Sequence, residues 1–274
     1  MPNYDDFITS NKAMWDEVTP AHVASKFYNV EGFLHDPRAL TLDPIELDEL
    51  PEDLTGHSLI HLQCHFGMDT LSLARMGASV TGVDLSTKSI ESAKQLAKQA
   101  GLNARFVASD VYHATEIIDE QFDVVFTSGG VLLWLPDLKR WAEVIDHFLK
   151  PGGWLYLREF HPFVYVFDDE HPSELRVRFS YFNEGEPNRF EGDGSYADPD
   201  YKGNHNVSYE WNHSLADIIS SLTAVGLKIE YLHEFPVISY KALPQMTQRK
   251  DGYWILPNGP QIPLMFSLKA HKPL

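Results

Sequence analysis

The sequence feature that most constrains the fold of this chain is a regular alternation of strand-like and helix-like segments between residues 58 and 160. Short apolar runs alternate with longer stretches in which apolar residues recur every three to four positions. Strands and helices that alternate in this way are typical of βαβ units, in which neighbouring strands are parallel and helices cover the sheet. The sequence therefore predicts an α/β fold around a mostly parallel sheet.

This alternation gives the order of the expected elements. Strands are predicted at Ser58–Gln63, Ser79–Val83, Ala104–Ala108, Phe122–Thr127 and Trp154–Phe160. Helices are predicted at Asp69–Met76, from Ser86 to Gly101 and at Leu138–Leu149. The pattern resumes with a helix from Ser214 to Gly226 and closes with strands at Leu227–Phe235 and Leu264–Ala270. We therefore assign residues 55–160 and 214–274 to one core.

The segment before this core, residues 1–54, is expected to form a helical cap. Between residues 10 and 30 the spacing of apolar side chains predicts two short helices that are separated at Thr19-Pro20. Proline lacks the backbone N–H that a helix interior needs, so it is expected to end the first helix. Both helices are expected to lie over the sheet.

Residues 161–213 separate the fifth strand from the next helix, and they are far more numerous than the residues of an ordinary βα connection. Apolar residues alternate within Leu175–Tyr181 and again within His205–His213, which predicts two strands joined by the loop Glu184–Gly203. We therefore expect a β-ribbon, inserted after the fifth strand, that acts as a lid.

The charge and cysteine content exclude several classes of function. The chain has 22 Lys and Arg against 39 Asp and Glu, a formal charge of −17, and such a field repels nucleic-acid phosphates and anionic lipids. The single cysteine, Cys64, cannot form an intrachain disulfide. No apolar run reaches the ~18 residues of a membrane span. We expect a cytoplasmic protein whose partner is a small molecule, not a nucleic acid or a membrane.

The first two strands indicate which kind of ligand the core binds. Leu59–Gly67 predicts a strand that runs through a tight turn into a helix, and Val83-Asp84 ends the next strand with a carboxylate. In α/β sheets ligands bind at the carboxyl ends of the strands, where such a carboxylate accepts hydrogen bonds from both ribose hydroxyls of an adenosine. The sequence therefore predicts a site for an adenosine-containing ligand.

Three segments together carry a family resemblance. Val83-Asp84-Leu85-Ser86, Ala108-Ser109-Asp110-Val111 and Leu149-Lys-Pro-Gly-Gly153 resemble, in order and spacing, the motifs of class I S-adenosylmethionine-dependent methyltransferases. The resemblance covers Leu59–Phe160 and the closing helix and strands. The loop His-Leu-Gln-Cys-His-Phe-Gly67 is similar to that of a group of bacterial members of the small-molecule type. It implies a Rossmann-like doubly wound sheet, with S-adenosylmethionine as methyl donor and S-adenosylhomocysteine as product.

The resemblance also implies a set of cofactor-binding residues. The loop after the first strand would wrap the methionine part of the cofactor, Asp84 would bind the ribose, and Asp110 would contact the adenine amine. The full implied set is His61, Leu62, Gln63, Cys64, His65, Gly67, Asp84, Leu85, Asp110, Val111 and Ser128. The loop departs from the family because His61, Gln63 and His65 replace its acid and its first two glycines.

Two other functions fit part of this pattern. A nicotinamide (NAD)-dependent oxidoreductase shares the ribose-binding carboxylate, but its pyrophosphate needs a glycine-rich turn, and this chain has bulky residues there and Asp69 at the helix start. A protein that binds S-adenosylmethionine without catalysis would carry the same motifs. The expected function is methyl transfer to an oxygen, nitrogen or sulfur atom of a small molecule.

Catalytic and substrate-binding residues are expected around the lid. His161 follows the fifth strand, where it would either act as a general base or hold the hinge of the lid by a hydrogen bond. Aromatic residues of the cap, the lid and the segment after the fourth strand are expected to close the acceptor pocket: Trp15, Tyr28, Trp134, Tyr209 and Trp211. No metal site is expected, because the evenly spaced His57, His61 and His65 cross a strand and a loop instead of sharing a helix face.

Overall fold

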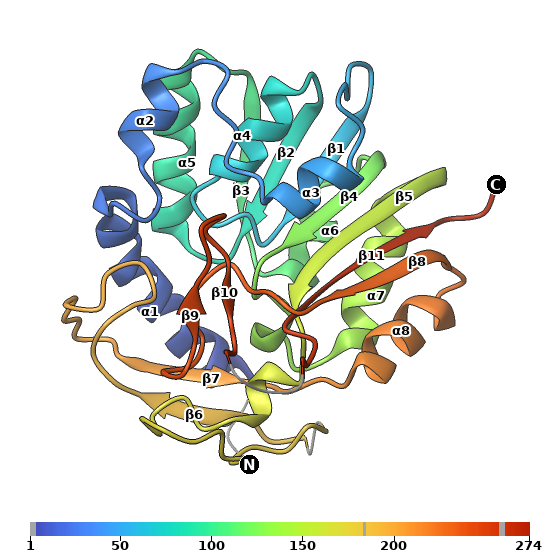
Figure 1. The fold of residues 1–274 in the computed structure, drawn as a ribbon. Coiled ribbons are helices and arrows are strands. Elements are labelled where there is room, and N and C mark those ends of the chain that lie inside the picture. The colour runs from blue at the N-terminus through green and yellow to red at the C-terminus, as the bar shows by residue number, and fades with distance from the viewer. Residues whose placement is uncertain (1–3, 183–184, 258–260) are drawn as a thin grey trace.

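The computed structural model describes residues 4–182, 185–257 and 261–274. Met1–Asn3, the start of the expected cap, and Glu184, the first residue of the expected lid loop, lie outside these ranges. The described chain forms a central sheet with helices on both faces, and two small two-stranded sheets lie beside it (Figure 1). No helix of the described ranges is long and apolar enough to span a membrane.

The central sheet has seven strands in the order β3-β2-β1-β4-β5-β11-β8. Their bounds are β1 Ser58–Leu62, β2 Ser79–Asp84, β3 Ala104–Ala108, β4 Phe122–Ser128, β5 Leu149–Phe160, β8 Lys228–Phe235 and β11 Met265–His271. The strands β1 to β5 pair in parallel, whereas β11 is antiparallel to both of its neighbours. The strand order reverses between β1 and β4, the point at which α/β sheets bind ligands. The Rossmann-like doubly wound sheet is therefore confirmed.

Helices on the two faces of this sheet bury separate apolar clusters. One face carries α2 Val30–His35, α3 Pro44–Glu49, α4 Met68–Arg75 and α5 Thr87–Ala100. The other carries α6 Ala114–Ile117, α7 Leu138–Phe148 and α8 Leu215–Ala224. Three short 3₁₀ turns lie in the connections: η1 Val111–His113, η2 Leu132–Trp134 and η3 Val164–Val166. The core is thus buried on both sides, as its continuous apolar strands predict.

Helix α5 illustrates why local sequence predicts this core well. The Ser86 side chain accepts a hydrogen bond from the Ser89 N–H at 3.0 Å, and Gly101 ends the helix with a φ of 67°. A serine hydroxyl satisfies an N–H that the first turn leaves free, and glycine tolerates the left-handed region. Ser214 and Asp217 likewise form a capping box at the predicted start of α8. These predictions are confirmed.

The cap differs from the prediction at Pro20. A single helix, α1 Tyr4–Ala24, continues through Pro20, where the sequence predicts a break. This helix packs along α5, and the Asp16 carboxylate accepts a hydrogen bond from the Ser86 hydroxyl at 2.7 Å. The Thr19 and Ser89 hydroxyls also meet, at 2.8 Å. The predicted break is wrong because the tertiary contacts of Asp16 and Thr19 with α5 and its cap outweigh the one backbone hydrogen bond that proline removes.

The lid contains a two-stranded ribbon, but only one of its strands is the predicted one. β6 Asn188–Glu191 pairs antiparallel with β7 Val207–Glu210. In the described part of the lid, Leu175–Tyr181 forms no strand and makes a single isolated bridge at Val177. The side chain of Val177 is 68% exposed, so the alternating apolar residues have no buried face to fill. The strand predicted at 175–181 is therefore wrong, because alternation indicates a face but does not supply a partner strand.

Side chains of α1 hold this ribbon against the cap. Asn11 accepts a hydrogen bond from the Tyr209 N–H and donates one to the Tyr209 carbonyl, each at 2.8 Å. The Ser10 hydroxyl donates to the Val207 carbonyl at 3.1 Å. Figure 1 shows β6 and β7 beyond the carboxyl end of β5, with α1 beside them. We call α1 and the β6–β7 ribbon together the cover.

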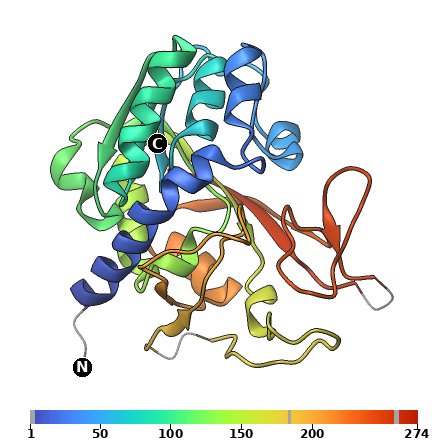
Figure 2. The same cartoon turned by 90° about the vertical axis from the view of Figure 1, so that its left-hand side faces the viewer.

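A further hairpin lies in the connection between β8 and β11, a region that the sequence assigns to the core without an insertion. β9 Thr247–Gln248 pairs antiparallel with β10 Trp254–Ile255, and this segment projects from the body of the molecule (red in Figure 2). Apolar residues near it, among them Ile238 and Leu243, are buried together with Val164 of the lid. The segment before the hairpin therefore packs against the lid.

Candidate functional site

A large cavity opens at the carboxyl ends of the parallel strands. Its volume is about 950 Å³, near the upper end of the ~300–1,000 Å³ typical of small-molecule sites. Its lining comes from the loops after β1, β2, β3 and β4, from α1, from the lid and from residues 239–243. The cover thus lies over the edge of the sheet at which α/β proteins bind ligands.

The loop after β1 adopts left-handed conformations without two of the glycines that usually provide them. Gln63 has a φ of 57° and His65 a φ of 52°. The Gln63 side-chain N–H donates to the Val131 carbonyl at 2.9 Å, and the His65 backbone N–H donates to the Asp84 carboxylate at 2.7 Å. These hydrogen bonds stabilise a turn that glycine would make without strain.

Gly67 is the residue of this loop at which a side chain would not fit. Its φ is 82°, and a Cβ built on it would lie 2.7 Å from the Phe106 ring and 2.9 Å from the Cβ of Ala93. Carbon atoms that are not bonded prefer ~3.5–4.0 Å. The absence of a side chain therefore lets α4, which begins at the next residue, approach α5 and β3 closely.

We expect Gly67→Ala to lower the free energy of unfolding by about 2–4 kcal/mol, because overpacking adds to left-handed strain. Gly101→Ala is the matched control, since Gly101 has a φ of 67° but no atom within 4 Å of an added Cβ. The control should lose about 1–2 kcal/mol, the strain alone. Urea denaturation measures both changes, and equal losses would contradict the steric argument.

Asp84 lies where the sequence predicts a ribose-binding carboxylate. It ends β2, lines the cavity, and accepts the His65 N–H at 2.7 Å on one oxygen and the Ser86 N–H at 2.8 Å on the other. Burial raises the pKa of Asp84 from 3.8 to about 6. Each carboxylate oxygen accepts more than one hydrogen bond, so both keep capacity for the two hydroxyls of a ribose. The geometry fits the implied cofactor.

Two more residues of the implied set bring polar atoms to this cavity. The Gln63 side-chain oxygen is buried and has no hydrogen-bond partner within the described chain. Asp110 follows β3, accepts the Tyr112 N–H at 2.9 Å as the cap of η1, and lines the cavity. Because a buried acceptor without a donor costs free energy, the Gln63 oxygen is suited to a ligand N–H or O–H.

The structure brings most of the implied cofactor residues together. Besides those above, His61, Cys64, His65, Leu85, Val111 and Ser128 line the cavity. Leu62 is fully buried in β1, and it is not among the described residues that line the cavity. The side chain of Leu62 therefore belongs to the core, and its role as a cofactor contact stays a prediction.

A buried ion pair beside the cavity had no signal in the sequence. Arg158 of β5 and Glu46 of α3 meet at 2.7 Å, although 112 positions separate them, and both side chains are buried. Asp69 at the start of α4 accepts a hydrogen bond from Thr41 at 2.5 Å, and burial, together with the nearby Glu46 charge, raises its pKa to about 7. Arg158 and Asp69 both line the cavity. They place a cation and an acid beside the Gln63 loop.

The loop after β4 is fixed by Glu159, which lies two residues before His161. Its buried carboxylate accepts backbone hydrogen bonds from Gly130 at 2.6 Å, Val131 at 2.7 Å and Leu132 at 3.0 Å. Charge-assisted bonds of this kind are strong, so the loop is rigid at the edge of the cavity. The structure thus gives Glu159 a role in positioning that loop.

Three of the predicted acceptor-pocket aromatics line the cavity: Trp15, Tyr28 and Trp134. The Trp15 ring lies 5.2 Å from the Trp134 ring and 5.4 Å from the His65 ring, centroid to centroid. The Tyr28 hydroxyl forms a hydrogen bond with the hydroxyl of Tyr196 in the lid. Aromatic contacts therefore join the cap, the Gln63 loop and the lid above the cavity.

Tyr209 and Trp211 do not belong to the described lining of the cavity. Both pack against Phe7 of α1, with ring centroids 4.5 Å and 5.8 Å away. The backbone N–H of Trp211 also donates to the Leu133 carbonyl at 2.7 Å. The structure thus places their side chains where the cap meets the lid, and their role in the acceptor pocket stays a prediction.

His161 is also absent from the described lining of the cavity. Its Nε2 lies 2.9 Å from the Glu234 carboxylate, its Nδ1 accepts the Phe163 N–H at 3.1 Å, and its side chain is 6% exposed. Burial lowers its pKa, although the Glu234 charge opposes that shift. A general base must reach the proton that it takes, so this geometry disfavours the base role and favours the hinge role.

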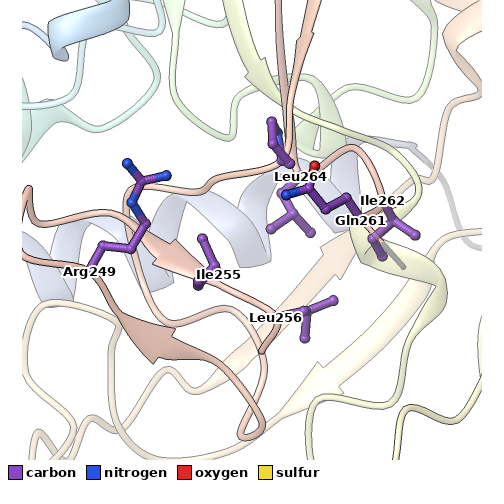
Figure 3. A pocket seen from close by; sticks show the side chains of 7 residues that line it. Arg249, Ile255, Leu256, Gln261, Ile262 and Leu264 are labelled. Carbon is purple, nitrogen blue, oxygen red and sulfur yellow. The ribbon is translucent and has the colours of Figure 1, made fainter. Parts of the chain in front are cut away.

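A second, much smaller hollow lies under the β9–β10 hairpin (Figure 3). It has a volume of about 80 Å³, and residues such as Ile255, Leu256 and Leu264 line it, with Arg249 and Gln261 at its rim. This volume is below the ~300 Å³ at which small-molecule sites begin. The large cavity is therefore the candidate site.

Comparisons with known proteins show which families the chain is similar to. Residues 60–153 match a family model described as a methyltransferase domain. The ubiquinone biosynthesis O-methyltransferase of Coxiella burnetii is 31% identical over 131 residues, which are 46% of this chain and 55% of that protein. The protein of the same name from Erwinia tasmaniensis is 30% identical over 137 residues, 48% of this chain and 54% of that protein. The chain spans about half the length of the curated relatives it matches.

Solved structures resemble a larger part of the chain. An S-adenosylmethionine-dependent methyltransferase from Methanosarcina mazei matches 86% of this chain and 100% of its own, with a TM-score of 0.54 and 23% identity. One from Mesorhizobium loti matches 84% and 96%, with a TM-score of 0.57 and 20% identity. At these identities the likeness is one of fold. Residues 60–153 therefore resemble a methyltransferase domain, and the chain has the fold seen in these S-adenosylmethionine-dependent methyltransferases.

Proposed function

We propose that this protein is an S-adenosylmethionine-dependent methyltransferase that acts on an oxygen, nitrogen or sulfur atom of a small molecule. The observation that carries the proposal is the position of Asp84, a partly buried carboxylate with spare acceptor capacity at the end of β2. It faces a cavity of about 950 Å³, and it lies within residues 60–153, which match the methyltransferase-domain model. Small-molecule sites usually have volumes of ~300–1,000 Å³, so a cavity near the upper end of this range has room for an acceptor beside the cofactor.

The residues of this chain divide between holding the cofactor and enclosing the reaction. Asp84 would accept both ribose hydroxyls, Asp110 would bind the adenine amine, and the Gln63 loop would hold the methionine part. When bound, the cofactor supplies an electrophilic methyl group on a sulfonium sulfur. Trp15, Tyr28 and Trp134, which line the cavity, would exclude water and orient the acceptor. We assign residues 1–54 and 161–213 to this enclosing function, because hydrogen bonds join α1 to the lid.

Calorimetric titration with S-adenosylmethionine, S-adenosylhomocysteine and NAD tests the proposal directly. We expect both sulfur ligands to bind and NAD not to bind, because the Gln63 loop offers bulky side chains where pyrophosphate needs free backbone amides. Binding of NAD alone would contradict the proposal. Transfer of a labelled methyl group into a fractionated metabolite extract then separates an enzyme from a protein that only binds the cofactor.

We expect the affinity for S-adenosylhomocysteine to fall about tenfold for each pH unit below pH 6, because the pKa of Asp84 is about 6 and the protonated carboxyl loses acceptor sites. Above pH 6 the ionisation of Asp84 should no longer change the affinity. The variant Asp84→Asn should bind weakly and lose the dependence. An unchanged wild-type dissociation constant between about pH 5 and pH 8 would contradict ribose binding by an ionised Asp84.

A further inference from the structure

The half of the cavity that lies toward the lid differs from the half around Asp84. Its lining includes two acids, Asp169 and Glu210, and several aromatic residues: Phe160, Tyr165, Phe167, Phe179, Phe190 and Tyr240. A Cβ built on Gly130 would lie 2.8 Å from the Phe160 ring and 3.9 Å from the Tyr165 hydroxyl. This half therefore begins directly at the loop after β4, next to Ser128, a residue of the implied cofactor set.

Glu210 faces this half of the cavity, and no cationic side chain of the described residues pairs with it. It ends β7, and its carboxylate accepts a long hydrogen bond, 3.4 Å, from Ser208 on the same strand. Within the described residues no Lys, Arg or His lies at ion-pair distance from it or from Asp169. Burial raises the pKa of Glu210 to about 7, and the Asp169 charge adds to this shift. A cation that approaches such a carboxylate stabilises its ionised form.

The Tyr165 hydroxyl provides a second, independent indication of a ligand. It is buried, it belongs to a residue that lines the cavity, and it has no hydrogen-bond partner in the part of the chain that the structure describes. Buried hydroxyls in folded proteins are rarely left without a partner. A hydroxyl can either donate or accept, so it suits an amine or an alcohol group of a bound molecule.

The charge balance of the whole cavity favours a cation over an anion. Its described lining contains six carboxylates, namely Asp43, Asp69, Asp84, Asp110, Asp169 and Glu210, but a single Lys or Arg, Arg158. Arg158 is already paired with Glu46. Aromatic faces add to this preference, since they attract cations and repel anions.

We propose that this half of the cavity is the acceptor subsite and that the acceptor is a small organic amine, bound as its ammonium form by Glu210 and Asp169 between aromatic faces. The ammonium would pass one proton to the Glu210 carboxylate before the nitrogen lone pair attacks the sulfonium methyl, and the electrons of the broken C–S bond would leave on the sulfur of S-adenosylhomocysteine. The inference rests on the proposed methyltransferase function and narrows its acceptor class. The methyltransferase-domain match ends at residue 153, before every lid residue of this subsite. The acceptor preference is thus a property of this chain's own lid.

Matched probes test the subsite. Protein saturated with S-adenosylhomocysteine is titrated calorimetrically with 2-phenylethylamine, 2-phenylethanol and 3-phenylpropionate, at about pH 8 so that Glu210 is ionised. We expect the amine to bind about tenfold more tightly than the alcohol, and the carboxylate not to bind. Glu210→Gln should weaken amine binding about tenfold and leave alcohol binding unchanged.

Glu191→Gln is the matched control, because Glu191 lies in the same ribbon, pairs with Arg189 and is exposed. It should leave amine binding unchanged. Equal binding of amine and alcohol, no detectable amine binding, or an unchanged amine affinity in Glu210→Gln overturns the inference.

Titration of each variant with S-adenosylhomocysteine alone keeps the two proposals distinct. Glu210→Gln should bind it like the wild type, and this result also shows that the variant is folded. If S-adenosylhomocysteine does not bind to the wild type, the proposed function fails. If it binds while the amine does not, the amine subsite alone fails.

Discussion

Asp84→Ala is expected to weaken the binding of S-adenosylhomocysteine by a factor of about 100 or more. Two hydrogen bonds from ribose hydroxyls to a charged acceptor are each worth ~1.5–3 kcal/mol, and the variant loses both. It also loses the carboxylate that accepts the His65 N–H at 2.7 Å, so the Gln63 loop loses an anchor. Isothermal titration calorimetry at about pH 7.5, where Asp84 is ionised, measures the effect.

The fold should not lose stability in this variant. The pKa of Asp84 is raised from 3.8 to about 6, so its ionised form disfavours the folded state above pH 6, and this penalty fades as the pH falls toward 3.8. Removing the carboxylate at about pH 7.5 removes that penalty, which offsets the lost backbone hydrogen bonds. Asp53→Ala is the control, because Asp53 is exposed and its carboxylate bonds only to Thr55 nearby. A variant Asp84→Ala that binds like Asp53→Ala would refute the assignment.

Arg158→Met is expected to lower the free energy of unfolding by about 3–5 kcal/mol, the usual effect of removing one partner from a buried ion pair. Glu46 is 0% exposed and would remain without the guanidinium that now lies 2.7 Å away. Asp69 would be affected as well, since the Arg158 charge lowers its otherwise raised pKa. Urea denaturation at neutral pH provides the measurement.

Two comparisons make this result specific. Arg178→Met removes an arginine that pairs with Asp168 and Glu170 at the surface, and its effect should be much smaller. The double variant Glu46→Gln with Arg158→Met should recover part of the lost stability, because no unpaired charge remains in the pair and glutamine can still accept the Asp43 N–H that caps α3. If Arg158→Met unfolds no more easily than Arg178→Met, the pair does not have the importance that its burial suggests.

Elements whose causes are local could be predicted from the sequence. The strand predicted at Ser58–Gln63 is observed at Ser58–Leu62, and α5 begins and ends at the predicted serine and glycine. Apolar periodicity and capping act within a few residues, so they can be read along the chain. The break predicted at Pro20 failed because its outcome depends on α5, a distant segment.

The candidate site divides in the same way. Asp84, Asp110 and the Gln63 loop follow directly after predicted strands, and the parallel sheet brings the ends of those strands to one edge. Their place in the cavity is thus a consequence of topology that the motifs already indicate. Lid residues follow no such rule, because their positions depend on how the ribbon packs against α1.

The sequence by itself therefore determined the βαβ core, the carboxylate that ends β2 and the loop that departs from the family's glycines, because each depends on neighbours in the chain. Only the tertiary structure decided that His161 turns to Glu234 and that Tyr209 and Trp211 fill the joint with the cap. It also brought Tyr165 and Glu210 to the cavity. These positions depend on contacts between distant segments, and the spacing of residues along a chain carries no record of such contacts.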